Sequence, residues 1–207
     1  MKILVIGGLG SIGSRYCAIL KWLGIEYEIL DIGMGRLEAR EFDRAIIATP
    51  TETHYDYCKQ LVEMGKPFLC EKPVSKDLKE CEELAAIKNG YVVNNYEIIY
   101  RRKWNTSSKE YPPNISYHCY KTGKDGLDFD CSQLIYMAGY GFLTLTKDSP
   151  IWSLRMNGDI VTYKELEESY VWMIQAWLLD FKEWLWTMRD GYEMTKAVLE
   201  YEAHHAR

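Results

Sequence analysis

Lys72 is the residue of this sequence best placed to do chemistry, because it lies in the turn Glu71-Lys72-Pro73, which directly follows an apolar stretch. A lysine ammonium can give a proton to a developing alkoxide or stabilise its negative charge. Two earlier turns, at residues 8–13 and 49–51, also follow apolar stretches. Together the three turns predict a nicotinamide-dinucleotide site with a lysine at its mouth.

The first turn has the glycine spacing of a dinucleotide-binding loop between an apolar stretch and a helical pattern. Gly8 allows a tight turn, Gly10 lets the backbone approach a pyrophosphate, and Gly13 lets the helix pack closely on the sheet. The helix that begins near Ser11 and Ile12 would direct free N–H groups and its positive dipole end at the phosphates. We therefore expect the phosphates of a dinucleotide at this turn.

Asp31 ends the second apolar stretch, about 20 residues after the glycines. A carboxylate there accepts hydrogen bonds from the adenosine ribose hydroxyls and repels a 2′-phosphate. It therefore favours NAD. Because Arg36 lies close by, NADP stays open as the alternative cofactor.

The order of the expected elements predicts an α/β fold with two domains. Residues 1–95 alternate strands and helices, which indicates a doubly wound parallel sheet, with a shortened crossover between Asp31 and Ala45. Residues 96–207 predict a smaller α+β domain with an open, mainly antiparallel sheet. Its long helical pattern runs from Leu166 to Met188, and Gly191 is expected to end it.

Composition excludes several classes of protein. The 207 residues carry a net charge of −5, so no basic surface for nucleic acid is expected. No apolar run is long enough to span a membrane, and the N-terminus enters a strand without a signal peptide. The six cysteines lack paired metal spacing, so we expect buried thiols, no metal and a cytoplasmic location.

Three motifs of the first half resemble the glucose–fructose oxidoreductase and inositol dehydrogenase superfamily (Gfo/Idh/MocA). They are residues 8–13, the run Ala48-Thr49-Pro50-Thr51 with His54, and Glu71-Lys72-Pro73. The resemblance implies a Rossmann domain followed by an α/β domain that carries a sugar-like substrate. It places Lys72 beside the nicotinamide and the substrate carbonyl, before a cis proline at Pro73. The cofactor would be flanked by a set of residues from the last two motifs: Thr49, Pro50, Thr51, His54, Glu71 and Lys72.

The family's next motif pairs an aspartate with a histidine three residues later. Here Asp130 takes the place of the aspartate and Gln133 that of the histidine, and we expect both, with Tyr96, to contact the substrate. Asp130 is either a substrate acceptor or a helix cap. Glutamine cannot transfer a proton at neutral pH, so the family's proton relay is missing. The chain is also shorter than typical members.

Two functions remain open at this point. The first is an NAD(P)-dependent oxidoreductase that acts on a sugar or nucleotide-sugar carbonyl or alcohol. The second is a cofactor-binding sensor or scaffold that has lost turnover. Retention of Lys72 favours the enzyme, whereas Gln133 and the shortened substrate domain favour the sensor.

The second half also predicts a homodimer through its sheet. The expected strands at residues 140–146, 151–156 and 160–163 offer apolar side chains on both faces, and the helices beyond them can cover only one. A twofold pairing of sheets would bury the other face. The apolar side chains are Phe142, Leu143, Leu145, Ile151, Trp152 and Leu154.

Overall fold

The structure is a computed structural model that describes residues 1–105, 114–118, 132–139, 142–146 and 153–205. The chain forms two compact units. The first comprises Met1–Val93 and Trp186–Tyr192, and the second comprises Asn94–Leu185 and Glu193–Arg207. A boundary between domains after residue 95 stays a prediction.

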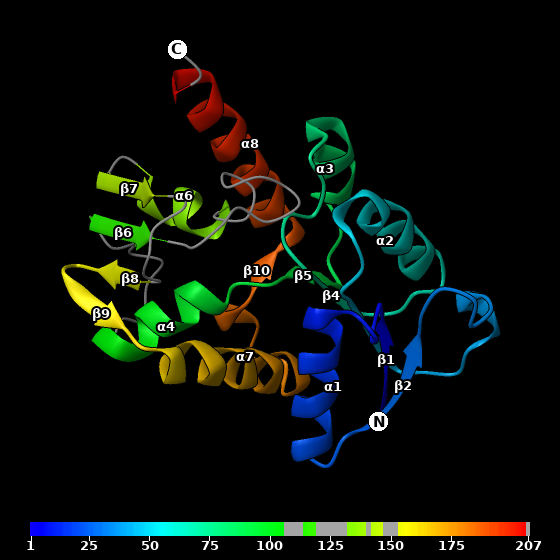
Figure 1. Cartoon of the computed structure of the whole chain (residues 1–207). Coiled ribbons are helices and arrows are strands. Elements are labelled where there is room, and N and C mark those ends of the chain that lie inside the picture. Colours follow the sequence, from blue (N-terminus) through cyan, green and yellow to red (C-terminus); the bar gives the residue numbers. More distant parts are fainter. Residues whose placement is uncertain (106–113, 119–131, 140–141, 147–152, 206–207) are drawn as a thin grey trace. The chain divides into compact units, whose positions relative to one another are not determined.

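The first unit is built on a six-stranded sheet with the order β10-β5-β4-β3-β1-β2 (Figure 1). β10 runs antiparallel to β5, and the other five strands are parallel to their neighbours. The predicted α/β class is therefore confirmed. The strands are β1 (Lys2–Ile6), β2 (Glu26–Leu30), β3 (Arg44–Ile47), β4 (Phe68–Cys70), β5 (Gly90–Val92) and β10 (Trp186–Thr187).

Helices cover both faces of this sheet. α1 (Ser11–Trp22) follows β1, α2 (His54–Glu63) follows β3, and α3 (Leu78–Leu84) follows β4. The crossover from β1 to β2 runs one way along the sheet, and those from β3 to β4 and from β4 to β5 run the other way. Because such crossovers are right-handed, α1 lies on one face and α2 and α3 lie on the other (Figure 1). The shortened crossover is confirmed, since only a 3₁₀ turn at Leu37–Ala39 lies between β2 and β3.

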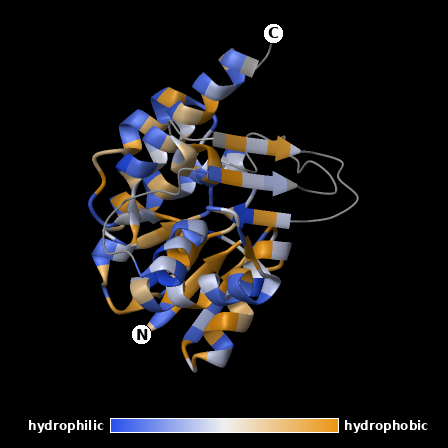
Figure 2. Cartoon of the chain, turned by 90° about the vertical axis from the view of Figure 1, so that its left-hand side faces the viewer, coloured by the Kyte–Doolittle hydropathy of each residue, from blue (hydrophilic) through white to orange (hydrophobic). Residues whose placement is uncertain are grey.

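The apolar runs of β1, β3 and β4 form the core of the first unit. Ile3, Leu4 and Val5 expose no surface, nor do Phe68 and Leu69. Strands covered on both faces carry such continuous apolar runs, which Figure 2 shows as orange segments of the sheet. The turns after β1, β2, β3 and β4 all lie at one edge, and the order of the strands reverses beside β1, where open α/β sheets bind ligands.

The second unit contains a four-stranded sheet with the order β7-β6-β8-β9. Its strands are β6 (Asn114–His118), β7 (Phe142–Thr146), β8 (Ser153–Met156) and β9 (Asp159–Val161). β6 and β7 are parallel and the other two pairs are antiparallel, as expected of a mainly antiparallel sheet. Asn157 and Gly158 join β8 to β9 with φ angles of 52° and 85°, which suit a type I′ hairpin.

Among the described residues, the apolar side chains of this sheet lie mostly on one face. Ile115 pairs with Leu143 and Met156, and Tyr117 pairs with Leu145 and Leu154, so these apolar side chains share one face. Leu143 and Leu145 pack against a cluster of Ile135 and Val198, which lie on α6 (Ser132–Ala138) and α8 (Met188–His205). The opposite face carries Thr144, Arg155 and, paired with Arg155, Ile160, and all three are exposed. Ile151, Trp152 and the side chain of Phe142 lie outside the described residues.

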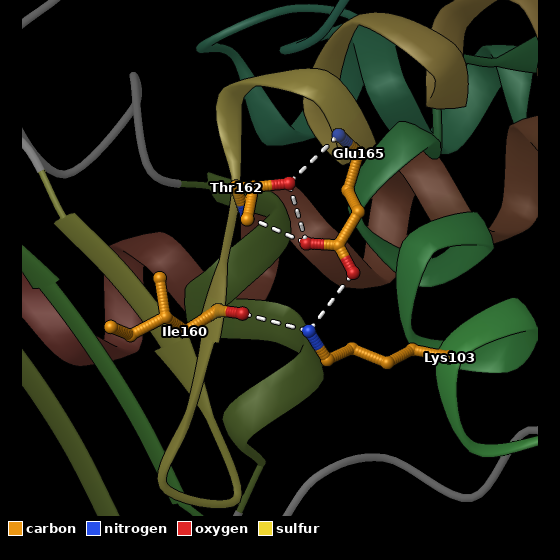
Figure 3. A network of polar contacts seen from close by, with 4 residues as sticks. All are labelled: Lys103, Ile160, Thr162 and Glu165. Atoms are coloured by element: carbon orange, nitrogen blue, oxygen red, sulfur yellow. Dashed lines mark hydrogen bonds and ion pairs between the residues drawn. The ribbon is translucent and has the colours of Figure 1, made fainter.

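α7 (Tyr163–Leu178) begins at a capping box that also fastens it to α4 (Asn95–Trp104). Thr162 Oγ1 accepts from the Glu165 N–H at 3.2 Å, and Glu165 Oε2 accepts from the Thr162 N–H at 2.7 Å. Lys103 Nζ donates to Glu165 Oε1 at 2.9 Å and to the Ile160 carbonyl at 2.7 Å (Figure 3). Burial raises the pKa of Glu165, but the hydrogen bonds from Thr162 and Lys103 outweigh it and hold the pKa below its ordinary value.

The single helix predicted between Leu166 and Met188 is wrong. α7 ends at Leu178, Asp180 takes the left-handed φ of 58°, and the chain passes through β10 before α8 begins. Gly191 lies inside α8 and does not end a helix. A Cβ atom there would lie 2.8 Å from Val74 Cγ2 and 2.9 Å from Val92 Cγ2, so the glycine permits close packing on the sheet.

Candidate active site

The glycine turn after β1 is shaped by Gly7, which the sequence reasoning missed. Gly7 has a φ of +82°, and a Cβ atom there would lie 2.7 Å from the Ala48 carbonyl oxygen. Gly10 donates its N–H to the Gly7 carbonyl at 3.0 Å. A Cβ atom on Gly13 would lie 2.1 Å from that same oxygen, so α1 approaches the turn in the way expected for Gly13. Gly7 could have been identified from its place directly before the motif.

α1 begins at Ser11 with Gly10 as its extended N-cap residue. No side chain caps this end, and the first helical turn contains no acidic residue. The first N–H groups of a helix have no partner within it, so those near Ser11 and Ile12 remain suited to an anion. The predicted phosphate site is therefore compatible with the local structure.

Asp31 follows β2 and is bonded to the glycine turn itself. Its Oδ2 accepts from the Leu9 N–H at 2.9 Å, and its Oδ1 accepts from the Ile32 N–H at 2.8 Å. Each carboxylate oxygen can accept a further hydrogen bond. Asp31 thus holds the turn in shape and keeps acceptor capacity for ribose hydroxyls.

His54 connects the turn after β3 to the turn after β4. Its Nδ1 lies 2.8 Å from the Pro73 carbonyl oxygen, and its Nε2 lies 2.8 Å from the Thr49 carbonyl oxygen. Thr53 Oγ1 donates to Thr49 Oγ1 at 2.8 Å, which further orders residues 49–51. The buried imidazole therefore fixes the distance between the two motif turns.

The turn after β4 presents Lys72 next to a buried carboxylate. Glu71 accepts from the Tyr16 hydroxyl of α1 and from the Lys72 N–H, the second at 3.1 Å. The Lys72–Pro73 peptide bond is cis, as the family resemblance implied. Lys72 itself is half-buried. Glu71 and His54 thus hold the backbone on either side of Lys72.

The cysteine nearest Lys72 is a structural thiol. Burial raises the pKa of Cys70 well above its ordinary value. Cys17, Cys58, Cys70 and Cys81 are all buried and free, as predicted. Cys119 and Cys131 lie outside the described residues.

Gln133 and Tyr96 meet in the second unit, together with a residue that the sequence reasoning missed. Gln133 is fully buried on α6, and its Nε2 donates to Asn95 Oδ1 at 3.0 Å. The Tyr96 N–H donates to Gln133 Oε1 at 3.2 Å. Asn95 comes directly before Tyr96, but no spacing rule linked it to Gln133. Asp130 lies outside the described residues.

The proposed cofactor residues therefore gather at one edge of the sheet in the first unit, and Tyr96 and Gln133 belong to the second. Within the described ranges, no group of three or more His, Cys, Asp and Glu residues could hold a metal ion. Among the helices in the described part of the chain, none has the length and apolar character needed to cross a bilayer.

Sequence comparison relates part of the first unit to a known family. The model of an oxidoreductase family, Gfo/Idh/MocA with an NAD-binding Rossmann fold, matches residues 33–93. The match includes the turns after β3 and β4, whereas the glycine turn and Asp31 precede it. The rhizopine catabolism protein MocA of Rhizobium meliloti is 38% identical over 28% of this chain and 18% of its own length. A myo-inositol dehydrogenase of Streptomyces leeuwenhoekii is 41% identical over 42% of this chain and 33% of its own.

The chain thus spans a third or less of the length of these curated relatives. Its fold resembles solved structures over nearly the whole of both chains. A Gfo/Idh/MocA family oxidoreductase from Vibrio cholerae has a TM-score of 0.70 at 13% identity, covering 100% of this chain and 99% of that one. The WlbA (WbpB) dehydrogenase from Thermus thermophilus, in complex with NAD and UDP-GlcNAcA, has a TM-score of 0.66 at 12% identity, covering 96% and 93%. In sequence, residues 33–93 resemble the Gfo/Idh/MocA oxidoreductase family with its NAD-binding Rossmann fold, and the sheet of the first unit has the parallel order of such a fold.

Proposed function

We propose that the chain is an NAD-dependent oxidoreductase that transfers a hydride between nicotinamide and the carbonyl or alcohol of a sugar or nucleotide-sugar. The observation that carries the proposal is the turn after β4. There Lys72 is held between Glu71, which is bonded to α1, and Pro73, which is bonded to His54. This turn lies at the same edge of the sheet as the glycine turn and Asp31. NADP stays the alternative cofactor.

In this proposal each motif has one task. The nicotinamide, when bound, supplies or accepts the hydride. Ser11, Ile12 and the motif glycines Gly8, Gly10 and Gly13 receive the phosphates, and Asp31 accepts from the ribose hydroxyls. Thr49, Pro50, Thr51, His54 and Glu71 flank the cofactor and keep Lys72 in place.

Lys72 acts on the oxygen of the substrate. During reduction of a carbonyl this oxygen gains negative charge, and the ammonium either donates a proton to it or stabilises the charge. Tyr96 and Asp130 bind the substrate in this scheme, and the buried Gln133 supports that site through its hydrogen bonds with Asn95 and the Tyr96 N–H. The names of the inositol and UDP-sugar dehydrogenase relatives support a sugar-like substrate.

The experiment for this proposal is an assay of hydride transfer. The purified chain is incubated with NAD and either myo-inositol or UDP-GlcNAcA, and NADH formation is followed by absorbance. Turnover of either substrate supports the enzyme. NADH binding without turnover of any member of a broader sugar panel favours the second candidate, a dinucleotide-binding sensor or scaffold. Gln133 supports that second candidate, because its side-chain amide is engaged with Asn95 and cannot relay a proton.

Asp31→Ala is expected to weaken NADH binding by roughly 1–3 kcal/mol, because buried ribose hydroxyls and the Leu9 N–H lose their acceptor. Fluorescence titration with NADH and NADPH measures the effect. Asp31→Asn is the matched control, since an amide oxygen can still accept from Leu9 but no longer repels a phosphate. Unmodified protein should bind NADH at least as well as NADPH. A clear preference for NADPH contradicts the assignment and directs attention to Arg36.

A homodimer through the C-terminal sheet is part of the proposal. The sheet is open, and twofold pairing is the commonest way in which soluble chains associate. Trp152→Glu is expected to break the dimer and to lower stability. Light scattering at micromolar concentration measures both proteins, and a monomeric unmodified chain contradicts the prediction.

A further inference from the structure

α4 and α7 enclose a pocket of about 350 Å³ in the second unit, apart from every residue considered above. This volume lies at the lower end of the range for small-molecule sites. Apolar side chains dominate its wall, and Leu179 and Phe181 stay 63% and 51% exposed. The lining residues are Ile98, Arg102, Trp172, Gln175, Ala176, Leu179, Phe181 and Trp184.

Arg102 supplies the charge of this pocket. Its guanidinium carbon lies 4.0 Å from the centroid of the Trp172 ring, and the side chain is exposed. The structure records no ion pair between Arg102 and any carboxylate among the residues it describes. Stacking of this kind orders a guanidinium while its in-plane N–H donors remain available to a planar anion.

The neighbouring arginine shows the contrast. Arg101 is buried, pairs with Glu97, and donates to the Glu183 carbonyl at 2.8 Å. Its charge is balanced within the protein and serves the fold. Arg102, one residue further along the helix, lines the pocket instead, and its guanidinium lies over the Trp172 ring.

We propose that this pocket binds a small organic acid with a flat apolar body and a carboxylate. The carboxylate would form a bidentate pair with Arg102, and the apolar body would lie against Ile98, Trp172 and Phe181. Charge-assisted bidentate pairs provide both strength and orientation. The volume suits one or two fused rings and is small for a dinucleotide, and none of the lining residues is assigned to the cofactor.

Isothermal titration calorimetry of the full chain with 2-naphthoate tests the proposal, and 2-naphthamide serves as the neutral isostere. We expect naphthoate to bind more tightly than naphthamide. Arg102→Met should weaken naphthoate binding by about 10- to 100-fold, the effect of losing a charged hydrogen-bonded pair. The affinity for naphthamide should stay unchanged. Arg189→Met is the matched control, because Arg189 also stacks on an aromatic ring, Tyr192, at 4.7 Å.

Three results would overturn the site. In the first, the unmodified chain binds naphthoate and naphthamide equally tightly. In the second, the Arg102→Met variant binds naphthoate as tightly as the unmodified chain does. In the third, saturating NADH displaces naphthoate. Light scattering of the Leu179→Glu variant tests whether a second copy of the chain occupies the groove. If that variant converts a dimer to a monomer, the groove is an interface between two copies and the ligand proposal fails.

Discussion

Lys72→Met is expected to lower turnover of an identified sugar substrate by about 10²- to 10⁴-fold, the usual contribution of a positioned acid. NADH affinity should stay nearly unchanged, because the interaction that is lost belongs to the transition state. Methionine keeps most of the length of the side chain and removes the ammonium group with its charge and protons. Steady-state kinetics and NADH titration of the same preparation measure the two quantities.

Two further variants separate the roles that Lys72 could have. Lys72→Arg keeps a positive charge but cannot lose a proton, so it retains activity only if the residue stabilises the developing oxyanion. Gln133→Ala is expected to raise KM more than it lowers kcat, because Gln133 holds the backbone of Tyr96 in the proposed substrate site. A Lys72→Met protein with normal kcat rejects the lysine mechanism. An equal loss in Lys72→Met and Gln133→Ala would indicate a shared role in orienting the substrate.

The sequence predicts the first unit well because its determinants are local. Apolar runs that end in glycine or proline turns mark β1, β3 and β4. The spacing of Gly8, Gly10 and Gly13 is compatible with only a few backbone conformations. The close approach of Gly7 to the Ala48 carbonyl could not be read from the sequence, because Ala48 is distant along the chain.

The second half was harder to predict because long-range contacts decide its structure. The helical periodicity between Leu166 and Met188 continues across a break, which is set by Asp180 in a left-handed conformation and by pairing of β10 with β5. Neither feature changes the apolar pattern. The pairing of Asn95 with Gln133 likewise joins residues on two helices, α4 and α6, and depends on how they pack.

The second large effect is expected at the buried ion pair of α4. The side chains of Arg101 and Glu97 are only 5% and 1% exposed and lie one helical turn apart. Arg101 also donates to the Glu183 carbonyl, and its guanidinium lies 5.6 Å from the centroid of the Trp184 ring. The Arg101 guanidinium thus joins α4 to the segment that follows α7. Its loss should therefore destabilise the second unit as a whole.

Removing one partner leaves the other charge buried and unpaired, which costs about 3–5 kcal/mol. We therefore expect Glu97→Gln and Arg101→Met each to lower the free energy of unfolding by this amount in urea titrations. The double variant should lose less than the sum, because residues in contact do not act additively. Lys164→Met is the matched control: it breaks the Lys164–Glu168 pair of the same spacing, whose side chains are 83% and 42% exposed, and should cost less than about 1 kcal/mol. If Arg101→Met costs no more than Lys164→Met, the buried pair does not stabilise the second unit.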